Sequence, residues 1–287
     1  MIRSVLKIVR GIVRLRGSTD NTLIGNINDR LKVDAAVSVI SNFDPNLLSS
    51  FSRLRIADYS VVFDSITDVS NQPLYWNEKT VGSGTVTWLQ NQASIRLTTS
   101  IGATDKAIRS TNRHFKYISS VGLSLNFSGN FDGAQTNVVK RMGIFDDKDG
   151  LFFQVDGSGI SVVRRSFVSG SPVDEVVPQS SWNIDKLDGT GVSGITLDLT
   201  KQQIFLLDAQ WLGSGSIRFG FFIDGILRYV HKLNYANILS TVYSSTIKVP
   251  FRSEIYNTAV TTSSSNLYLT CVGMSFEGGN IVPAKLR

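Results

Sequence analysis

The chain has 287 residues, of which 42% are hydrophobic and 10% aromatic, a composition typical of a globular protein with a sizeable core. Its one cysteine, Cys271, excludes an intrachain disulfide and a multi-cysteine metal site, and we expect a small buried apolar residue there. The formal net charge is +6, and residues 1–16 carry five basic side chains, no acidic one and no aromatic one. Binding of nucleic acid through a basic stripe with interleaved aromatics is therefore not predicted, and packing against a partner protein is favoured.

Residues 1–41 are predicted to form an N-terminal arm. Arg3, Lys7, Arg10 and Arg14 interrupt every apolar run, so neither the apolar core of a secretion signal nor a membrane span of about 20 residues can form there. We expect a soluble chain with no membrane contact. The β-branched residues of the arm favour an extended conformation. The short apolar pairs of residues 17–40 lie among turn formers, so this segment should dock on the main domain, a sister subunit or another protein.

Residues 42–57 are predicted to be a linker that contains a short helix. Asp44 is a suitable N-cap and Pro45 a suitable first helical residue, and Leu47, Leu48, Phe51 and Leu54 follow at helical spacing.

Residues 58–287 are predicted to form one β-sandwich domain. Its centre is the stretch 201–237, where an Asp-Gly pair at 224–225 predicts a hairpin between two apolar strands. Strict alternation places Val121, Leu123, Leu125 and Phe127 on one face of another strand. About a dozen such strands, separated by turns, predict an all-β, two-sheet jelly roll. The expected strands lie in the following segments: 58–65, 85–90, 93–100, 106–119, 121–129, 138–166, 203–233, 247–257 and 265–278.

No residue pattern announces a reaction, so no catalytic, cofactor-binding or metal-binding residue is assigned. His114 and His231, both expected in strands, lack a serine elbow or a suitably spaced carboxylate. The FDDKDG segment (145–150) has the wrong register for a calcium loop and is predicted to be a hairpin tip. Glu175 and Glu254 are available as glycosidase carboxylates, although nothing selects a pair.

The four tryptophans, together with the tyrosines, could form a sugar-stacking platform, although burial in the core is the commoner role of such residues. They are Trp76, Trp88, Trp182 and Trp211.

One long segment carries a family resemblance. Residues 203–237 (QIFLLDAQWLGSGSIRFGFFIDGILRYVHKLNYAN) resemble a sandwich module of tailed-bacteriophage virion structural proteins, in which a strand ending in W-L-G precedes a glycine turn, a D/N-G turn and a strand ending in H-x-x-N-x-A-N. The resemblance extends to segments on both sides, in the same order: 17–34, 109–120, 140–157, 160–171, 182–205 and 249–257. The architecture also resembles concanavalin-like (LamG-type) sandwiches.

This resemblance implies a non-enzymatic structural protein of the virion, a component of the tail, neck or capsid appendage that is anchored through residues 1–40 and is homo-oligomeric. Two alternatives remain open, a lectin-like adhesin that binds a host surface glycan and a capsid decoration protein. Within the resembling segment, Trp211, His231 and Asn237 are expected to be a buried anchor, a strand residue and a turn residue, with no active site implied.

Overall fold

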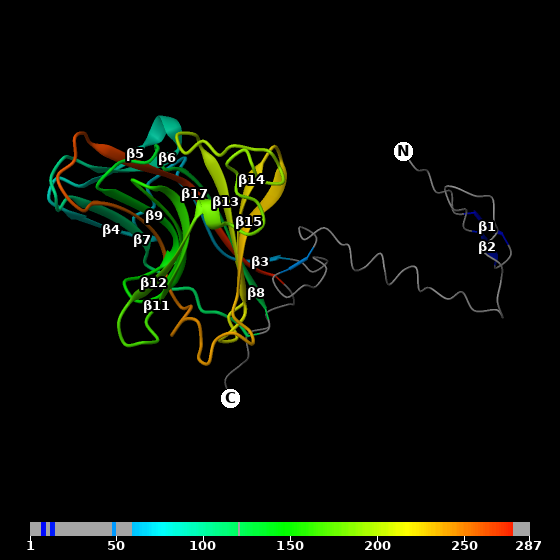
Figure 1. Ribbon diagram of the computed structural model, residues 1–287. Helices are drawn as coiled ribbons and strands as arrows, with labels where there is room; N and C mark the ends of the chain where they lie inside the picture. The colour runs from blue at the N-terminus through cyan, green and yellow to red at the C-terminus, as the bar shows by residue number, and fades with distance from the viewer. Residues whose placement is uncertain (1–6, 10–11, 15–47, 50–58, 120, 278–287) are drawn as a thin grey trace. The chain divides into compact units, whose positions relative to one another are not determined.

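The computed structural model describes residues 7–9, 12–14, 48–49, 59–119 and 121–277, in a chain that divides into two units, Met1–Asp44 and Pro45–Arg287 (Figure 1). In the first unit, strands β1 (Lys7–Val9) and β2 (Ile12–Arg14) form an antiparallel hairpin. The β-branched residues Ile8, Val9, Ile12 and Val13 suit strands. The rest of the predicted arm lies outside the described residues.

The predicted helical linker is described only at Leu48 and Ser49, and neither residue is helical. Leu48 is in an isolated β-bridge, and its carbonyl accepts a hydrogen bond from Arg218 Nη2 at 3.0 Å. At these two residues, contact with the sandwich has overridden the local helix signal. The other residues of the linker lie outside the described part of the chain.

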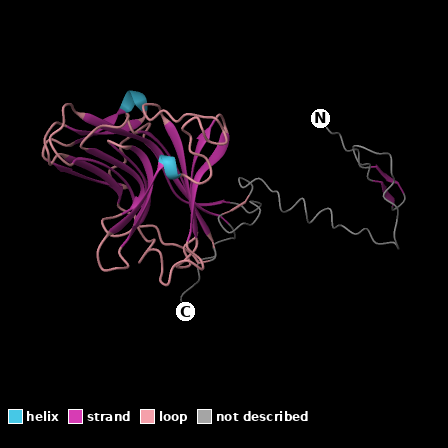
Figure 2. Ribbon diagram, viewed as in Figure 1, coloured by secondary structure: helices cyan, strands magenta, loops and turns pink. Residues whose placement is uncertain are grey.

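The second unit is an antiparallel sandwich of two sheets, which confirms the predicted all-β fold class (Figure 1). One sheet has seven strands in the order β12-β11-β10-β9-β16-β7-β4, and the other has eight, in the order β15-β14-β13-β8-β17-β6-β5 with β3 paired to β17. Figure 2 shows two short helical turns, η2 (Gln90–Gln92) and η3 (Gln179–Ser181), beside the strands.

The strand bounds of the seven-stranded sheet are β4 Trp76–Val81, β7 Lys106–Thr111, β9 Val138–Phe145, β10 Gly150–Asp156, β11 Gly159–Ser166, β12 Val173–Pro178 and β16 Phe251–Asn257. Those of the eight-stranded sheet are β3 Tyr59–Ile66, β5 Thr85–Leu89, β6 Ser94–Thr99, β8 Gly122–Asn130, β13 Gln203–Ala209, β14 Ser216–Ile223, β15 Ile226–Asn234 and β17 Ser265–Glu277.

The predicted central meander is present as β13, β14 and β15. Asp224 and Gly225 join the last two strands with φ of +56° and +72°, as a two-residue type I′ turn requires. Trp211 is half-buried against the core, His231 is a buried residue of β15, and Asn237 lies in the turn after β15 with φ +61°. His231 and Asn237 therefore have the structural roles that the sequence predicted, whereas Trp211, expected to be buried, packs against the core while remaining partly exposed.

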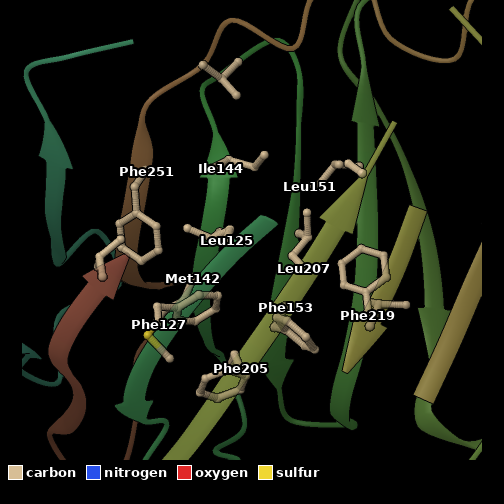
Figure 3. Packing of buried hydrophobic residues seen from close by; sticks show 14 of the residues in the cluster. Leu125, Phe127, Met142, Ile144, Leu151, Phe153, Phe205, Leu207, Phe219 and Phe251 are labelled. Carbon is tan, nitrogen blue, oxygen red and sulfur yellow. The ribbon is translucent and has the colours of Figure 1, made fainter. Parts of the chain in front are cut away.

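The core consists of the inward-facing residues of both sheets. Leu123, Leu125 and Phe127 point inward from β8, as their alternation predicted. Phe127 stacks on Phe205 with ring centroids 4.7 Å apart, and Phe153 of the opposite sheet lies 5.0 Å from Phe205 (Figure 3). Contacts between aromatic rings from facing sheets hold the two layers together.

Four local predictions are wrong. Residues 113–118 are irregular, because the Phe115 N–H donates to the Val249 carbonyl instead of to a neighbouring strand. The segment 167–200, expected to be loop, contains strand β12. Pro250, which the sequence predicted to mark an edge position or a bulge, precedes β16, and this strand lies between β9 and β7 in the middle of its sheet. Cys271 is half-exposed, and its Sγ lies 2.9 Å from Ser128 Oγ.

Candidate functional site

The outward-facing residues of the seven-stranded sheet form the densest cluster of charge in the described part of the chain, here called the charged face. Strand β16 shows how it arises: Ser253 and Ile255 are fully buried between the sheets, whereas Arg252, Glu254 and Tyr256 alternate with them and point outward. The pairing registers place Arg141 of β9 directly opposite Glu254. Side chains from strands distant in sequence are thereby brought into one row.

Glu254 lies at the centre of the charged face with only 2% of its side chain exposed. Its Oε1 accepts a hydrogen bond from Arg141 Nη1 at 3.2 Å, its Oε2 accepts one from Arg252 Nη2, and Lys106 Nζ lies 3.7 Å from Oε2. Such a buried carboxylate is tolerable because each oxygen has a charged donor. Both oxygens of Glu254 are therefore occupied by groups of the protein itself.

A second carboxylate, Asp174 of β12, is held in the same way. Arg165 donates to it through Nε at 2.7 Å and through Nη2 at 2.8 Å, the paired geometry that a guanidinium forms with a carboxylate. Arg141 links the two carboxylates, because its Nη2 lies 3.8 Å from Asp174 Oδ2 while its Nη1 binds Glu254. The result is one continuous network of alternating charges across the sheet.

The network lies on a small apolar cluster of its own, formed by Phe145, Phe152 and Val163. The two rings are 4.5 Å apart, and the guanidinium groups of Arg141 and Arg165 lie 5.2 and 5.3 Å from the centre of Phe152. Stacking of guanidinium on aromatic rings covers the rings and fixes the direction of the cations. The arginines are thus held from below by rings and from the side by carboxylates.

The acidic segment 145–150 is the predicted hairpin tip, between β9 and β10. Asp147 pairs with Arg252 at 2.8 Å, and this hydrogen bond lowers the pKa of Asp147. Asp149 is buried, and its oxygens accept hydrogen bonds from Phe167 N–H, from Ser245 N–H and from the hydroxyls of Ser244 and Ser245. These oxygens tie three loops together instead of facing an open cation position.

The two histidines lie apart from the charged face. His114 is exposed in the irregular segment after β7. His231 is buried in β15, where its Nδ1 accepts a hydrogen bond from the Asn183 N–H at 3.2 Å. Burial lowers the pKa of His231, and the negative charge of Glu175 opposes that shift. Glu175 itself accepts hydrogen bonds from Arg164 Nε and from the Tyr235 hydroxyl, so it forms no pair with Glu254.

The four tryptophans do not form a common exposed platform. Trp76 and Trp182 are buried, and Trp88 and Trp211 are half-buried against the core. Every indole N–H donates to an acceptor within the sandwich, which for the four residues in chain order is Ser65 Oγ, Thr67 O, Val177 O and Ser244 O. A sugar-stacking site built on these rings has no support in the geometry.

Sequence reasoning found Glu254 but none of the cations around it. Alternation on β16 could have indicated that Arg252 and Glu254 share a face; the partners from β7, β9 and β11 required the strand registers. Among the described residues there is no group of three potential metal ligands, and no helix is long and apolar enough to span a membrane.

Comparisons with known proteins identify the fold. Neither the models of known protein families nor the curated protein sequences contain a match. Among solved structures, a β-glucanase from Bacillus licheniformis is similar at 10% identity, with 76% of this chain and 98% of that chain covered and a TM-score of 0.50. A glycosyl hydrolase family 16 protein from Mycobacterium smegmatis is similar at 9% identity, with 75% and 100% covered and a TM-score of 0.51. At such identities the likeness concerns fold alone. The chain is a two-sheet, concanavalin-like β-sandwich.

Proposed function

We propose that this chain is a non-enzymatic structural protein of a tailed-bacteriophage virion, a homo-oligomeric component of the tail, neck or capsid appendage. Its sandwich is the body of the subunit, and residues 1–40 bind neighbouring virion proteins. The sequence resemblance suggests the particle, and the charged face suggests that the subunit carries out no chemistry.

The observation that carries the proposal is the occupation of both central carboxylates. A glycosidase needs one carboxyl group that reaches the leaving oxygen and a second that serves the anomeric carbon or a water molecule. In this sandwich Glu254 and Asp174 are bound by arginines and joined through Arg141. Neither carboxylate is presented to a substrate. The network instead stiffens the sheet, a useful property in a subunit that bears load within an assembly.

The inward hydrogen bonds of all four indole groups support the structural role over the glycan-binding alternative. A lectin that stacks sugars on tryptophan needs exposed ring faces, and rings with this orientation contribute packing area to the core.

The test is to locate the chain on particles of the phage that encodes it. Immunogold electron microscopy of purified virions should label one defined position, and particles without the chain would overturn the proposal. In parallel, the purified full chain should release no reducing sugar from β-glucans and should bind no member of a glycan array. Hydrolysis would overturn the non-enzymatic assignment, and specific glycan binding would favour the lectin-like adhesin.

A further inference from the structure

The outer face of the eight-stranded sheet contains two adjoining depressions of about 340 Å³ each. Both are lined by Asp64, Asn126 and Gly273, which stand opposite one another on β3, β8 and β17. We call this continuous feature the apolar trough. Its floor is formed by β17 and β8, and its two sides by β3 and by β13 with β14.

The floor of the trough is low because its outward-facing residues are small. Ser124, Ser128 and Gly273 contribute little or no side chain above the backbone. A Cβ added to Gly273 would meet nothing nearer than the Asn126 carbonyl oxygen at 3.9 Å. Space therefore remains directly above the centre of the sheet, where a larger side chain could stand.

The β3 side of the trough is a raised apolar ridge. Val61 is 64% exposed and Ile66 is 52% exposed, and Asp64 projects between them. On the opposite side Ile204 is 48% exposed. Neighbouring exposed aliphatic residues beside an empty apolar depression are typical of a surface that binds another protein.

The two polar groups of the trough lack partners within the described part of the chain. Asp64 is exposed and forms no ion pair there, and Asn126 makes no side-chain hydrogen bond although its Oδ1 is buried. The Nδ2 group of Asn126 can donate to a partner, whereas its buried Oδ1 is an acceptor that a carboxylate does not satisfy. The carboxylate is an acceptor and the amide carries two donors, so the two groups complement each other chemically.

The ridge on β3 runs beside the trough floor on β17 and β8. With strands about 4.8 Å apart, β3 and β8 are separated by about 10 Å, the width of one packed side-chain layer. A two-fold rotation that places the ridge of one copy over the floor of another also places the ridge of the second copy over the floor of the first. The same rotation brings each Asp64 towards the Asn126 amide of the other copy.

We infer that the apolar trough is the surface through which two copies of this chain associate. Val61 and Ile66 of one copy fill the space above Gly273 of the other, and Asp64 accepts a hydrogen bond from the amide of Asn126 across the interface. This inference deepens the homo-oligomeric role proposed above and rests on it. Beside the trough, the hydrogen bond from Arg218 to the Leu48 carbonyl marks where the chain's own residues already occupy the face.

The first test fills the space above the floor of the apolar trough. Gly273→Lys places a long charged side chain into open space at a position whose backbone accepts any residue, so the sandwich should fold with an unchanged circular dichroism spectrum. In sedimentation velocity, the full chain should be dimeric or a multiple of two, and Gly273→Lys should raise the dimer dissociation constant at least tenfold. The matched control is Val192→Lys, at a residue 91% exposed in a loop away from the trough, which should associate like the unmodified chain.

The second test exchanges the polar pair. Asn126→Asp places carboxylates opposite each other and should weaken association about tenfold, and the double variant Asn126→Asp with Asp64→Asn should restore it. Failure of the double variant to restore association would overturn the pairing. Equal association of Gly273→Lys and the unmodified chain, or a monomer at all concentrations, would overturn the inference itself.

These outcomes are separable from the test of function. A monomeric chain that immunogold labelling still finds on the virion would refute the dimer and leave the structural role in place. A trough-dependent dimer that is absent from particles would leave the interface in place and refute the virion assignment.

Discussion

The charged face and the apolar trough, on opposite sheets of the sandwich, differ in how their outward-facing polar groups are satisfied. Outward residues on the seven-stranded sheet are large and charged, and each buried carboxylate is matched by an arginine of the same chain. Outward residues above β17 and β8 are small, and Asp64 and Asn126 have no partner within the described residues. The first face is complete in itself, whereas the second is completed by another molecule.

The comparison indicates how stability and association are divided between the sheets. The paired charges over Phe145 and Phe152 cover this face without a second protein. Removing one charged residue then leaves its ion-pair partner buried without a counter-charge. A face of small and aliphatic residues contributes less within one chain and can be covered by a copy of itself. Substitutions on the charged face should therefore change unfolding, and substitutions in the trough should change assembly.

The largest effect is expected at the centre of the charged face. Glu254→Ala should lower the free energy of unfolding by about 3–5 kcal/mol, because it removes the buried carboxylate that the cations of Arg141 and Arg252 share. The control, Asp147→Ala, removes a carboxylate that is 86% exposed and should cost less than about 1 kcal/mol. Urea denaturation of both variants measures the difference. Equal losses would show that burial of the network does not matter.

A smaller effect is expected at the edge of the same network. Arg165→Met keeps an unbranched apolar side chain but removes the guanidinium that lies over Phe152 and both of its hydrogen bonds to Asp174, whose side chain is 25% exposed. The cost should be about 1.5–3 kcal/mol, the usual range for hydrogen bonds to charged groups. Lys148→Met, which alters an exposed cation near Phe167, should cost about 1 kcal/mol or less. If Lys148→Met were the more damaging variant, the network would not be the stabilising element.

The eight-stranded sheet should respond to pH through His231 of β15, because burial of this side chain disfavours its protonated form. His231 has a lowered pKa in the folded chain, so below its ordinary value of 6.5 the unfolded chain takes up the proton more readily. Stability from this group is present above pH 6.5 and is lost as the pH falls towards the folded pKa. Melting temperatures at pH 7.5, 6.5 and 5.5 should fall less steeply for His231→Gln than for the unmodified chain. Equal falls in melting temperature for His231→Gln and the unmodified chain would contradict the assignment of this pH dependence to His231.

The fold could be predicted from the sequence because its signals are local. Alternation in β8 and the Asp224–Gly225 turn each depend on neighbouring residues, and both are present as predicted. The segment 113–118 alternates just as well and is irregular, because the Val249 carbonyl binds the Phe115 N–H. Local pattern therefore indicates strand tendency, and tertiary contacts decide whether the strand forms.

The candidate surfaces could not be predicted, because their partners are distant in sequence. Arg141 and Glu254 are 113 residues apart and meet through the register of β9 with β16. Asp64, Asn126 and Gly273 come from three further segments. Alternation in β8 predicts that Asn126 points away from the core. Only the strand order shows that Gly273 of β17 lies next to Asn126 and that the carboxylate of Asp64 lies on the far side of Gly273.

The smallest effect on unfolding is expected in the trough, and it tests the division between the faces most directly. Ile204 and Val163 are aliphatic residues that face outward from opposite sheets, but Ile204 is 48% exposed and Val163 is fully buried under the charged face. Val163→Ser should cost about 2 kcal/mol through lost packing and a buried hydroxyl, whereas Ile204→Ser should change the free energy of unfolding by less than about 0.5 kcal/mol. Urea denaturation well below the dissociation constant isolates the monomer for this comparison. A large loss from Ile204→Ser under those conditions would mean that the trough already contributes to the stability of the single chain, and the contrast between the two faces would fail.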